Sequence, residues 1–179
     1  MAVYDNDSGA IKRGLENVKW SLTRLRERGK LSEDVDSIVS RIKVFENLRD
    51  ASENAELIVE AVFEDPAVKL EVFRKIEGYV NRGTLITSNT SGISITYLQK
   101  ALKYRERFAG FHWFNPPVLM RLIEVIRGKE TSDETIDKLV KIAKDLDKEP
   151  LVVKKDIRGF IANRVYRALR YHCVILYSR

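Results

Sequence analysis

Short apolar runs alternate with longer amphipathic stretches along the 179 residues of the chain. Such runs are typical of buried strands, and the stretches between them have the apolar spacing of helices. Strands and helices that alternate in this order predict an α/β fold with a mainly parallel sheet. The expected strands cover residues 2–4, 42–45, 57–63, 84–87, 107–113, 122–126 and 151–154.

Helix start and stop signals lie between these strands. Ser8 can cap a helix over residues 9–28 that ends at Gly29, and Pro66 suits the first turn of a helix to about residue 80. Further helices are expected after Ser32, after Thr131 or Ser132, and over residues 159–179.

The last of these helices has more apolar residues than a lone surface helix carries. They are Phe160, Ile161, Val165, Leu169, Val174 and Ile175. An apolar surface of this size needs something to pack against. We therefore expect a partner subunit or a further helical domain to cover it.

The chain is basic, with 32 Lys and Arg against 26 Asp and Glu, a net charge of +6 and a pI of about 9.4. A basic protein favours anionic partners such as phosphates or nucleic acid. The opposite charges are interleaved, however, as in KWSLTRLRERGKLSEDVDSIVSR, which is typical of solvated helix faces. We therefore expect no nucleic-acid partner.

A single cysteine, Cys173, can form no disulfide within the chain and has no cysteine partner for a zinc site. The N-terminal sequence MAVYDNDSG has no basic region, apolar core or cleavage site. No apolar run approaches the roughly 18 residues that a membrane span needs. We expect a cytoplasmic protein that binds no metal and no membrane.

Polar residues follow several of the expected strands. Asp5 follows the first, where a dinucleotide-binding fold places the acid that binds the adenosine ribose, although Asp is also an ordinary turn former. Glu64 follows the strand over 57–63, and Asn89 and Ser91 follow the next one. Because open α/β sheets bind ligands at the carboxyl ends of their strands, we expect these side chains to lie near one ligand-binding crevice. Taken singly, each of them could instead cap a helix.

The segment RFAGFHWFNPPVLMRLIEVIRG places His112 near the end of one strand and Glu124 within the next. A carboxylate inside an apolar run is costly to bury unless it is paired. His112 is the obvious partner, and a carboxylate fixes the tautomer of an imidazole and favours its protonated form. The pair predicts a general base, while a buried structural histidine is the alternative.

Seven motifs, in their order and nearly in their spacing, resemble the NAD-dependent L-3-hydroxyacyl-CoA dehydrogenase family, including its short-chain 3-hydroxybutyryl-CoA members. They are YDND, WSL, EAVFED, SNTS, GFHWFNPP, LIEVI and DIRGFIANR. The resemblance covers essentially the whole chain. It implies a Rossmann-like, doubly wound, mainly parallel NAD-binding domain at 1–155 that lacks the Gly-rich first strand and helix, followed at 156–179 by the first helix of an all-α dimerisation and substrate domain.

The same resemblance implies roles for individual residues. The residues implied in NAD binding are Asp5, Glu64, Lys69, Asn89, Ser91 and Asn115. Ser21 and Arg28 would contact coenzyme A, although the family more often has Lys at the second position. Ser91 and Asn163 would bind the substrate near its reacting oxygen.

In the mechanism that the resemblance implies, His112 removes the proton of the 3-hydroxyl while hydride passes from C3 to NAD, and Glu124 supports the imidazolium that forms. The substrate is then an acyl-CoA, the product a 3-ketoacyl-CoA, and the chain a homodimer through its C-terminal helix. Two alternatives remain open. One is a non-catalytic binding or assembly remnant, and the other is a dehydrogenase of the same fold that acts on a hydroxy acid without a thioester.

Overall fold

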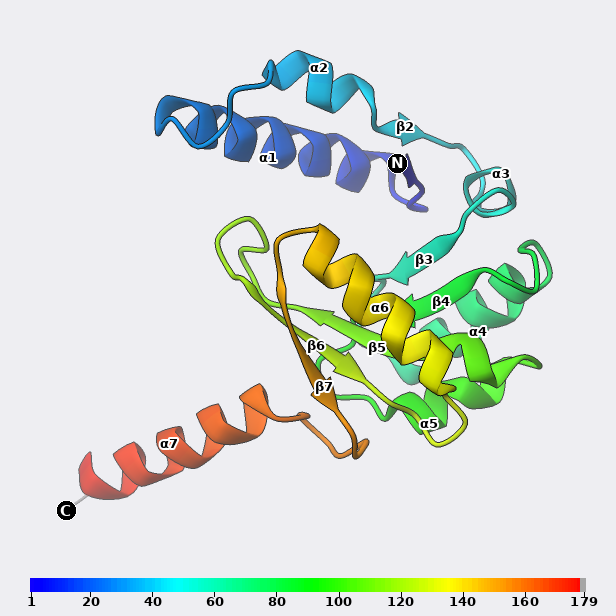
Figure 1. Cartoon of the computed structure of the whole chain (residues 1–179), viewed down its shortest axis with the longest axis vertical. Coiled ribbons are helices and arrows are strands. Elements are labelled where there is room, and N and C mark those ends of the chain that lie inside the picture. The colour runs from blue at the N-terminus through cyan, green and yellow to red at the C-terminus, as the bar shows by residue number, and fades with distance from the viewer. Residues whose placement is uncertain (178–179) are drawn as a thin grey trace. The chain divides into compact units, whose positions relative to one another are not determined.

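The computed structural model describes residues 1–177, with side chains up to residue 171, so those of Cys173, Val174 and Ile175 lie outside it (Figure 1). The chain divides into two compact units, Met1–Ala55 with Tyr79–Asn81 and Glu56–Gly78 with Arg82–Arg179. The domain boundary expected after residue 155 stays a prediction. Within the described part of the chain, no helix combines the length and apolar character that crossing a bilayer requires.

The first unit contains two short parallel strands, β1 (Ala2–Val3) and β2 (Lys43–Val44), which form a sheet of their own. Its helices are α1 (Ser8–Glu27), α2 (Val35–Ser40) and α3 (Leu48–Ser52). The side chain of Asp7, rather than that of Ser8, caps α1 by accepting the N–H of Gly9. Asp34 likewise caps α2, so that helix begins later than Ser32 suggested.

The second unit is built on a five-stranded sheet in the order β3 (Leu57–Glu60), β4 (Leu85–Ser88), β5 (Phe108–Trp113), β6 (Leu122–Ile126) and β7 (Glu149–Val153). All neighbours are parallel except β5 and β6, which are antiparallel. The helices are α4 (Pro66–Glu77), α5 (Ile95–Leu98), α6 (Asp133–Asp145) and α7 (Ala162–Tyr177), with short 3-10 turns at Gln99–Ala101 and Arg105–Arg107. The expected α/β class is confirmed.

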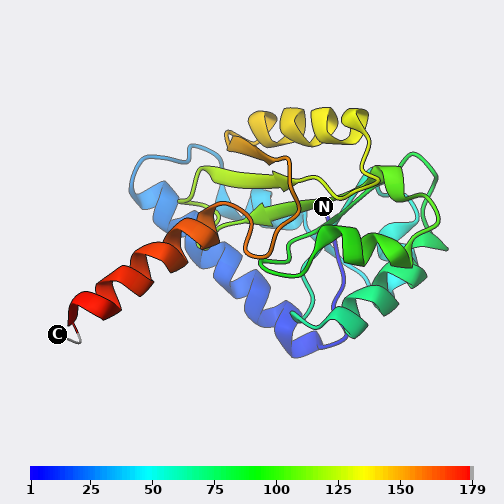
Figure 2. The same cartoon turned by 90° about the horizontal axis from the view of Figure 1, so that it is seen from below.

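Helices cover both faces of this sheet, as a doubly wound fold requires (Figure 2). On one face, α6 closes an apolar cluster of Leu85, Ala109, Phe111, Ile123, Val125, Ile136, Leu139 and Ala143. On the other face, Phe73 of α4 meets Phe108 edge to face, with ring centroids 4.9 Å apart. A side chain at Gly110 would lie 2.9 Å from Ile95 and Ile126, so the glycine lets α5 approach the strand closely.

The clearest differences from the sequence prediction lie at three element boundaries. Strand β3 ends at Glu60, three residues early, because the Glu60 carboxylate accepts the N–H of Val62 (2.7 Å) and the chain turns there. Strand β7 begins at Glu149 and includes Pro150, which an edge strand tolerates. Helix α7 begins at Ala162 instead of residue 159, because Gly159 (φ 81°) and Phe160 (φ 50°) adopt the left-handed conformation.

Candidate active site

His112 and Glu124 face each other across the antiparallel pair β5 and β6, where they are register partners. The Nδ1 atom of His112 lies 2.8 Å from Oε2 of Glu124, so the expected contact is present. Glu124 is fully buried and His112 nearly so. With Nδ1 directed at the carboxylate, Nε2 is the ring nitrogen that can meet a substrate. The aromatic rings of Phe114 and Phe160 lie against the imidazole.

The second oxygen of Glu124 holds the beginning of α7. Oε1 accepts the backbone N–H groups of Ile161 and Ala162, both at 2.9 Å. A carboxylate in this position satisfies two donors that a helix start leaves without partners within the helix. The same start positions Asn163, whose side-chain amide donates to the backbone oxygen of Ser91 (3.3 Å). Glu124 therefore connects the histidine to the segment that carries Asn163.

Glu64 organises the loop that follows β4. Its Oε1 atom accepts the hydroxyl of Thr90 (2.6 Å) and the backbone N–H groups of Ser91 (2.9 Å) and Gly92 (3.1 Å). The hydroxyl of Ser91 is 3.4 Å from the same oxygen. Glu64 and Ser91 thus meet at one edge of the sheet, as the sequence predicted, and both remain exposed to solvent.

Lys69 lies below this loop with a side chain only 1% exposed. Its ammonium group donates to Oε1 of Glu60 (2.7 Å) and to the backbone oxygen of Val62 (3.1 Å), and it is 3.4 Å from Oε2 of Glu64. Ser88 donates to the other oxygen of Glu60 (2.6 Å). In this arrangement Lys69 supports Glu64 from beneath, and the cofactor contact implied for Lys69 stays a prediction.

Asn89 and Asn115 flank the end of β5. The side-chain oxygen of Asn89 accepts the N–H of Trp113 (2.9 Å), which fixes the residue that follows β4 against the strand that carries His112. Asn115 is exposed and precedes a cis peptide bond to Pro116. The structure thus brings His112, Glu124, Ser91 and Asn163 together in the second unit, with Asn89 and Asn115 at the end of the same strand.

In the first unit, Asp5 lines a cavity of about 360 Å³ at the ends of β1 and β2. The other lining residues are Tyr4, Asn6, Ser8, Ile11, Val44, Phe45 and Glu46. An acid at the end of a strand, beside a cavity with polar and aromatic walls, suits the ribose and base of adenosine. Ser21 lies in α1 and Arg28 caps its end, two helical turns further along the same face.

Hydrogen bonding sets the charge state of both carboxylates at this site. Burial by itself raises the pKa of Glu124, but the hydrogen bonds from His112, Ala162 and Ile161 outweigh it and hold the pKa below its usual 4.5. Burial likewise raises the pKa of Glu64, but the hydrogen bonds from Thr90 and Ser91 and the charge of Lys69 outweigh this effect and hold the pKa below its usual value. Both side chains are therefore anionic at neutral pH.

We expect stability to fall as these carboxylates are protonated. A carboxyl with a lower pKa in the folded state stabilises the fold above its unfolded pKa, and that stabilisation is lost as pH falls through the folded pKa. Urea unfolding can be measured between pH 7 and pH 3, which roughly spans this window. The free energy of unfolding should fall less steeply with decreasing pH for Glu64→Gln than for the unsubstituted chain. Glu16→Gln on exposed α1 is the control, and identical slopes for all three chains would contradict the assignment.

Sequence reasoning missed Glu60, Ser88 and the backbone donors of α7. Glu60 carried a usable signal, because it is a single acid within the apolar run LIVEAV, just as Glu124 is within LIEVI. A buried acid predicts a buried partner, and Lys69 is the lysine one helical turn into α4. The N–H groups of Ile161 and Ala162 carry no sequence signal, since every residue other than proline has one.

A doubly wound sheet, with polar groups at its strand ends and a buried histidine–carboxylate pair, defines the class of Rossmann-like, dinucleotide-dependent dehydrogenases. The family model described as 3-hydroxyacyl-CoA dehydrogenase, NAD binding domain, matches residues 1–157. The chain belongs to this family, whose cofactor is NAD.

Several relatives agree with this assignment. The chain is 36% identical over 164 residues to the "Probable 3-hydroxybutyryl-CoA dehydrogenase" of Bacillus subtilis, a match that covers 91% of the chain and 56% of the relative. It is 39% identical over 141 residues to 5-formyl-3-hydroxy-2-methylpyridine 4-carboxylate 5-dehydrogenase of Mesorhizobium japonicum, with 79% and 46% covered. The chain thus spans about half the length of these relatives.

The fold is also that of solved dehydrogenases. The crystal structure of (S)-3-hydroxybutyryl-CoA dehydrogenase from Ralstonia eutropha superposes with a TM-score of 0.88 at 36% identity. The match covers 94% of this chain and 59% of that one. The Rossmann-like arrangement expected from the motifs is therefore confirmed.

Proposed function

We propose that the chain is the cofactor-binding and proton-handling part of an NAD-dependent dehydrogenase that oxidises L-3-hydroxyacyl-CoA to 3-ketoacyl-CoA. The observation that carries the proposal is the buried contact of 2.8 Å between His112 and Glu124 at the end of β5. The relatives named as hydroxybutyryl-CoA dehydrogenases support the choice of substrate.

In this proposal His112 acts as the general base. The Glu124 carboxylate fixes Nδ1, so Nε2 accepts the proton of the 3-hydroxyl and the imidazolium that forms is stabilised by the adjacent anion. When bound, NAD accepts the hydride that leaves C3 of the substrate. Ser91 and Asn163 are assigned to the reacting oxygen, because Asn163 already contacts the loop that bears Ser91.

The cofactor residues divide between the two units. Asp5 is assigned to the adenosine ribose of NAD, since it lines a cavity at the strand ends of the first unit. Glu64, Asn89 and Asn115 are assigned to the nicotinamide end in the second unit, with Lys69 holding Glu64 in place. Ser21 and Arg28 are assigned to coenzyme A, for which one face of α1 offers a hydroxyl and a cation.

One relative gives a specific reason for a second candidate. The Mesorhizobium japonicum enzyme, 39% identical over 141 residues, is named for a pyridine carboxylate and not for a thioester. A hydroxy acid without coenzyme A is therefore the alternative substrate class. A homodimer through α7, implied by the resemblance, and a cytoplasmic location, expected from the sequence, are further parts of the proposal.

A chimaera can decide among these functions. Residues 1–179 would replace the matching segment of the Bacillus subtilis relative, and the oxidation of NADH would be followed at 340 nm with acetoacetyl-CoA and with free acetoacetate. We expect turnover of the thioester to exceed that of the free acid by roughly tenfold or more, because the coenzyme A contacts contribute binding energy. Equal rates would contradict the thioester assignment.

The same chimaera tests the non-catalytic alternative. A titration with NADH, followed by fluorescence, serves as the control for folding of the cofactor site. A chimaera that binds NADH and turns over neither substrate would contradict the proposed activity and support a binding remnant.

A further inference from the structure

A pocket in the second unit, Glu56–Gly78 with Arg82–Arg179, has a strongly basic rim. It has a volume of about 450 Å³ and is lined by Thr96, Arg127, Gly128, Lys129, Lys154, Lys155 and Asp156. Four cationic residues and one acid give this lining a formal charge of +3. Half of the net charge of +6 of the whole chain is therefore gathered at one place, in contrast to the interleaved charges elsewhere.

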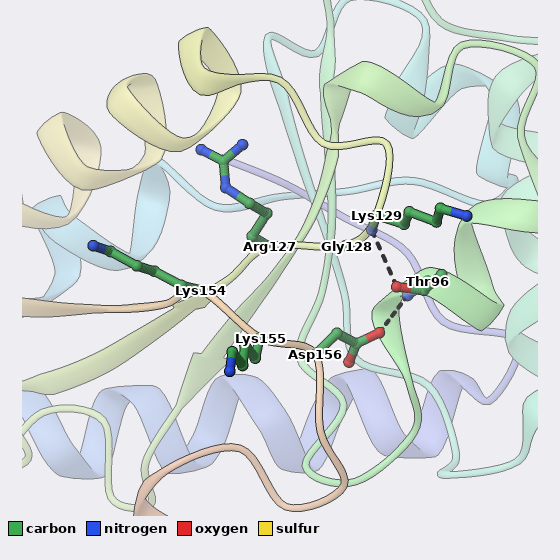
Figure 3. Close-up of a pocket in the computed structure, with 7 residues that line it drawn as sticks. All are labelled: Thr96, Arg127, Gly128, Lys129, Lys154, Lys155 and Asp156. Atoms are coloured by element: carbon green, nitrogen blue, oxygen red, sulfur yellow. Dashed lines mark hydrogen bonds between the residues drawn. The ribbon is translucent and has the colours of Figure 1, made fainter.

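Two carboxylates near the pocket have hydrogen-bond partners, although Oδ1 of Asp156 has none among the described residues. Asp156 accepts the hydroxyl of Ser94 and the backbone N–H of Thr96, each at 2.7 Å, so it ties the floor of the pocket to the beginning of α5 (Figure 3). Arg127 donates to Asp133 of α6 and to the backbone oxygen of Thr131. These contacts fix the floor and one side of the pocket.

The three lysines remain available for a ligand. Among the residues that the structure describes, no carboxylate oxygen lies within 4.0 Å of the ammonium group of Lys129, Lys154 or Lys155. All three side chains are exposed. Figure 3 shows Lys129, Lys154 and Lys155 leaving the pocket in different directions, while Arg127 points toward α6. The lysine side chains thus begin at the rim of the pocket while their exposed ammonium groups diverge, and rotation of these side chains toward the pocket would let them share an anion at its centre.

The pocket is distinct from the candidate active site. Arg127 follows β6, and the register places Ile126 opposite Gly110, near the middle of β5. Since β6 runs antiparallel to β5, the chain at Arg127 has moved away from the end of β5 that carries His112. A ligand in this pocket therefore lies apart from the site of hydride transfer.

We propose that this pocket binds a small anion with two linked phosphate groups. A single phosphate would engage only part of the rim, because the ammonium groups stand on separate sides of the pocket. Two linked phosphates carry enough charge to neutralise the three free lysines, and a volume of about 450 Å³ accommodates them. Inorganic pyrophosphate and the diphosphate of a nucleotide share this chemistry.

Calorimetric titration of the 179-residue chain with inorganic pyrophosphate tests the proposal. We expect saturable binding of one equivalent that weakens as salt is added, since the contacts are exposed ion pairs. Lys129→Gln, Lys154→Gln and Lys155→Gln in one chain should weaken binding by about tenfold or more, because three exposed ion pairs are lost together. ADP, titrated in parallel into the unsubstituted chain and the triple variant, distinguishes a nucleotide from the inorganic anion by the part of its binding that the triple variant loses, since the cavity at Asp5 is present in both chains.

A control of equal charge separates a built site from diffuse attraction. Lys12→Gln, Lys141→Gln and Lys144→Gln together remove the same three charges from exposed helix positions of α1 and α6. We expect binding within about twofold of the unsubstituted chain. An equal loss in both triple variants, or no saturable binding at all, would overturn the proposal.

A second measurement needs no substitution. Acetylation of surface lysines with a limiting amount of reagent, mapped by mass spectrometry, should slow at Lys129, Lys154 and Lys155 when pyrophosphate is present. Lys12 and Lys141 should react at unchanged rates. Equal protection of all five lysines would count against a local site.

Discussion

Replacing His112 by glutamine is expected to reduce turnover of the chimaera by a factor on the order of 10² or more, while NADH affinity stays within about twofold. Glutamine preserves the size of the side chain and can still hydrogen-bond to Glu124, but it cannot take up a proton near neutral pH. A loss of this size corresponds to about 2.7 kcal/mol or more in the barrier. The measurement is the rate of acetoacetyl-CoA reduction at saturating NADH.

Glu124→Gln should lower turnover as well, because the amide leaves the imidazolium without its adjacent anion. The control is Glu130→Gln, which removes an exposed acid that pairs with Arg105 at 2.9 Å and lies outside the site. If His112→Gln kept turnover within about twofold, the general-base role would be wrong. A loss in the Glu130 variant equal to that in the Glu124 variant would show that the effect is not specific to the pair.

Glu60→Gln is expected to cause the largest loss of stability, about 3–5 kcal/mol in the free energy of unfolding. The ammonium group of Lys69 lies 2.7 Å from Glu60, and both side chains are almost completely buried. Neutralising the acid leaves a buried cation whose remaining carboxylate, that of Glu64, is farther away at 3.4 Å. Urea unfolding at pH 7 measures the change.

Glu71→Gln provides the matched control, because Glu71 pairs with Lys75 at 2.6 Å on the exposed side of α4, the helix that carries Lys69. Exposed pairs contribute roughly 0–1 kcal/mol, so we expect a small effect. Combining Glu60→Gln with Lys69→Met should recover part of the loss, since no buried charge then remains without a partner. Equal effects of the two glutamate substitutions would contradict a buried ion pair.

The sequence contained enough information to predict the central contact of the site. An acid within the apolar run LIEVI had to be buried, and a histidine at a nearby strand end was its natural partner. The alternation of apolar runs and helical stretches likewise predicted the α/β class. Both inferences depend on short sequence patterns, and these can be recognised without knowing which distant segments pack together.

Other features depend on contacts between distant parts of the chain. Helix α7 starts at Ala162 because Gly159 and Phe160 turn the chain and Glu124, 38 residues earlier, accepts its first N–H groups. The support of Glu64 by Lys69 requires α4 to pack beneath the loop after β3. The basic pocket gathers residues from α5 and from the segments that follow β6 and β7, which lie far apart in the sequence.

The two oxygens of Glu124 perform different tasks, since one contacts His112 and the other receives two backbone groups at the start of α7. If α7 detached, the carboxylate would lose two of its three donors while remaining next to the imidazole. Its proton affinity would then rise, and the histidine would lose a firmly placed anion. The placement of the Glu124 carboxylate beside His112 thus depends on the start of α7, which couples the position of this helix to the geometry of the proposed base.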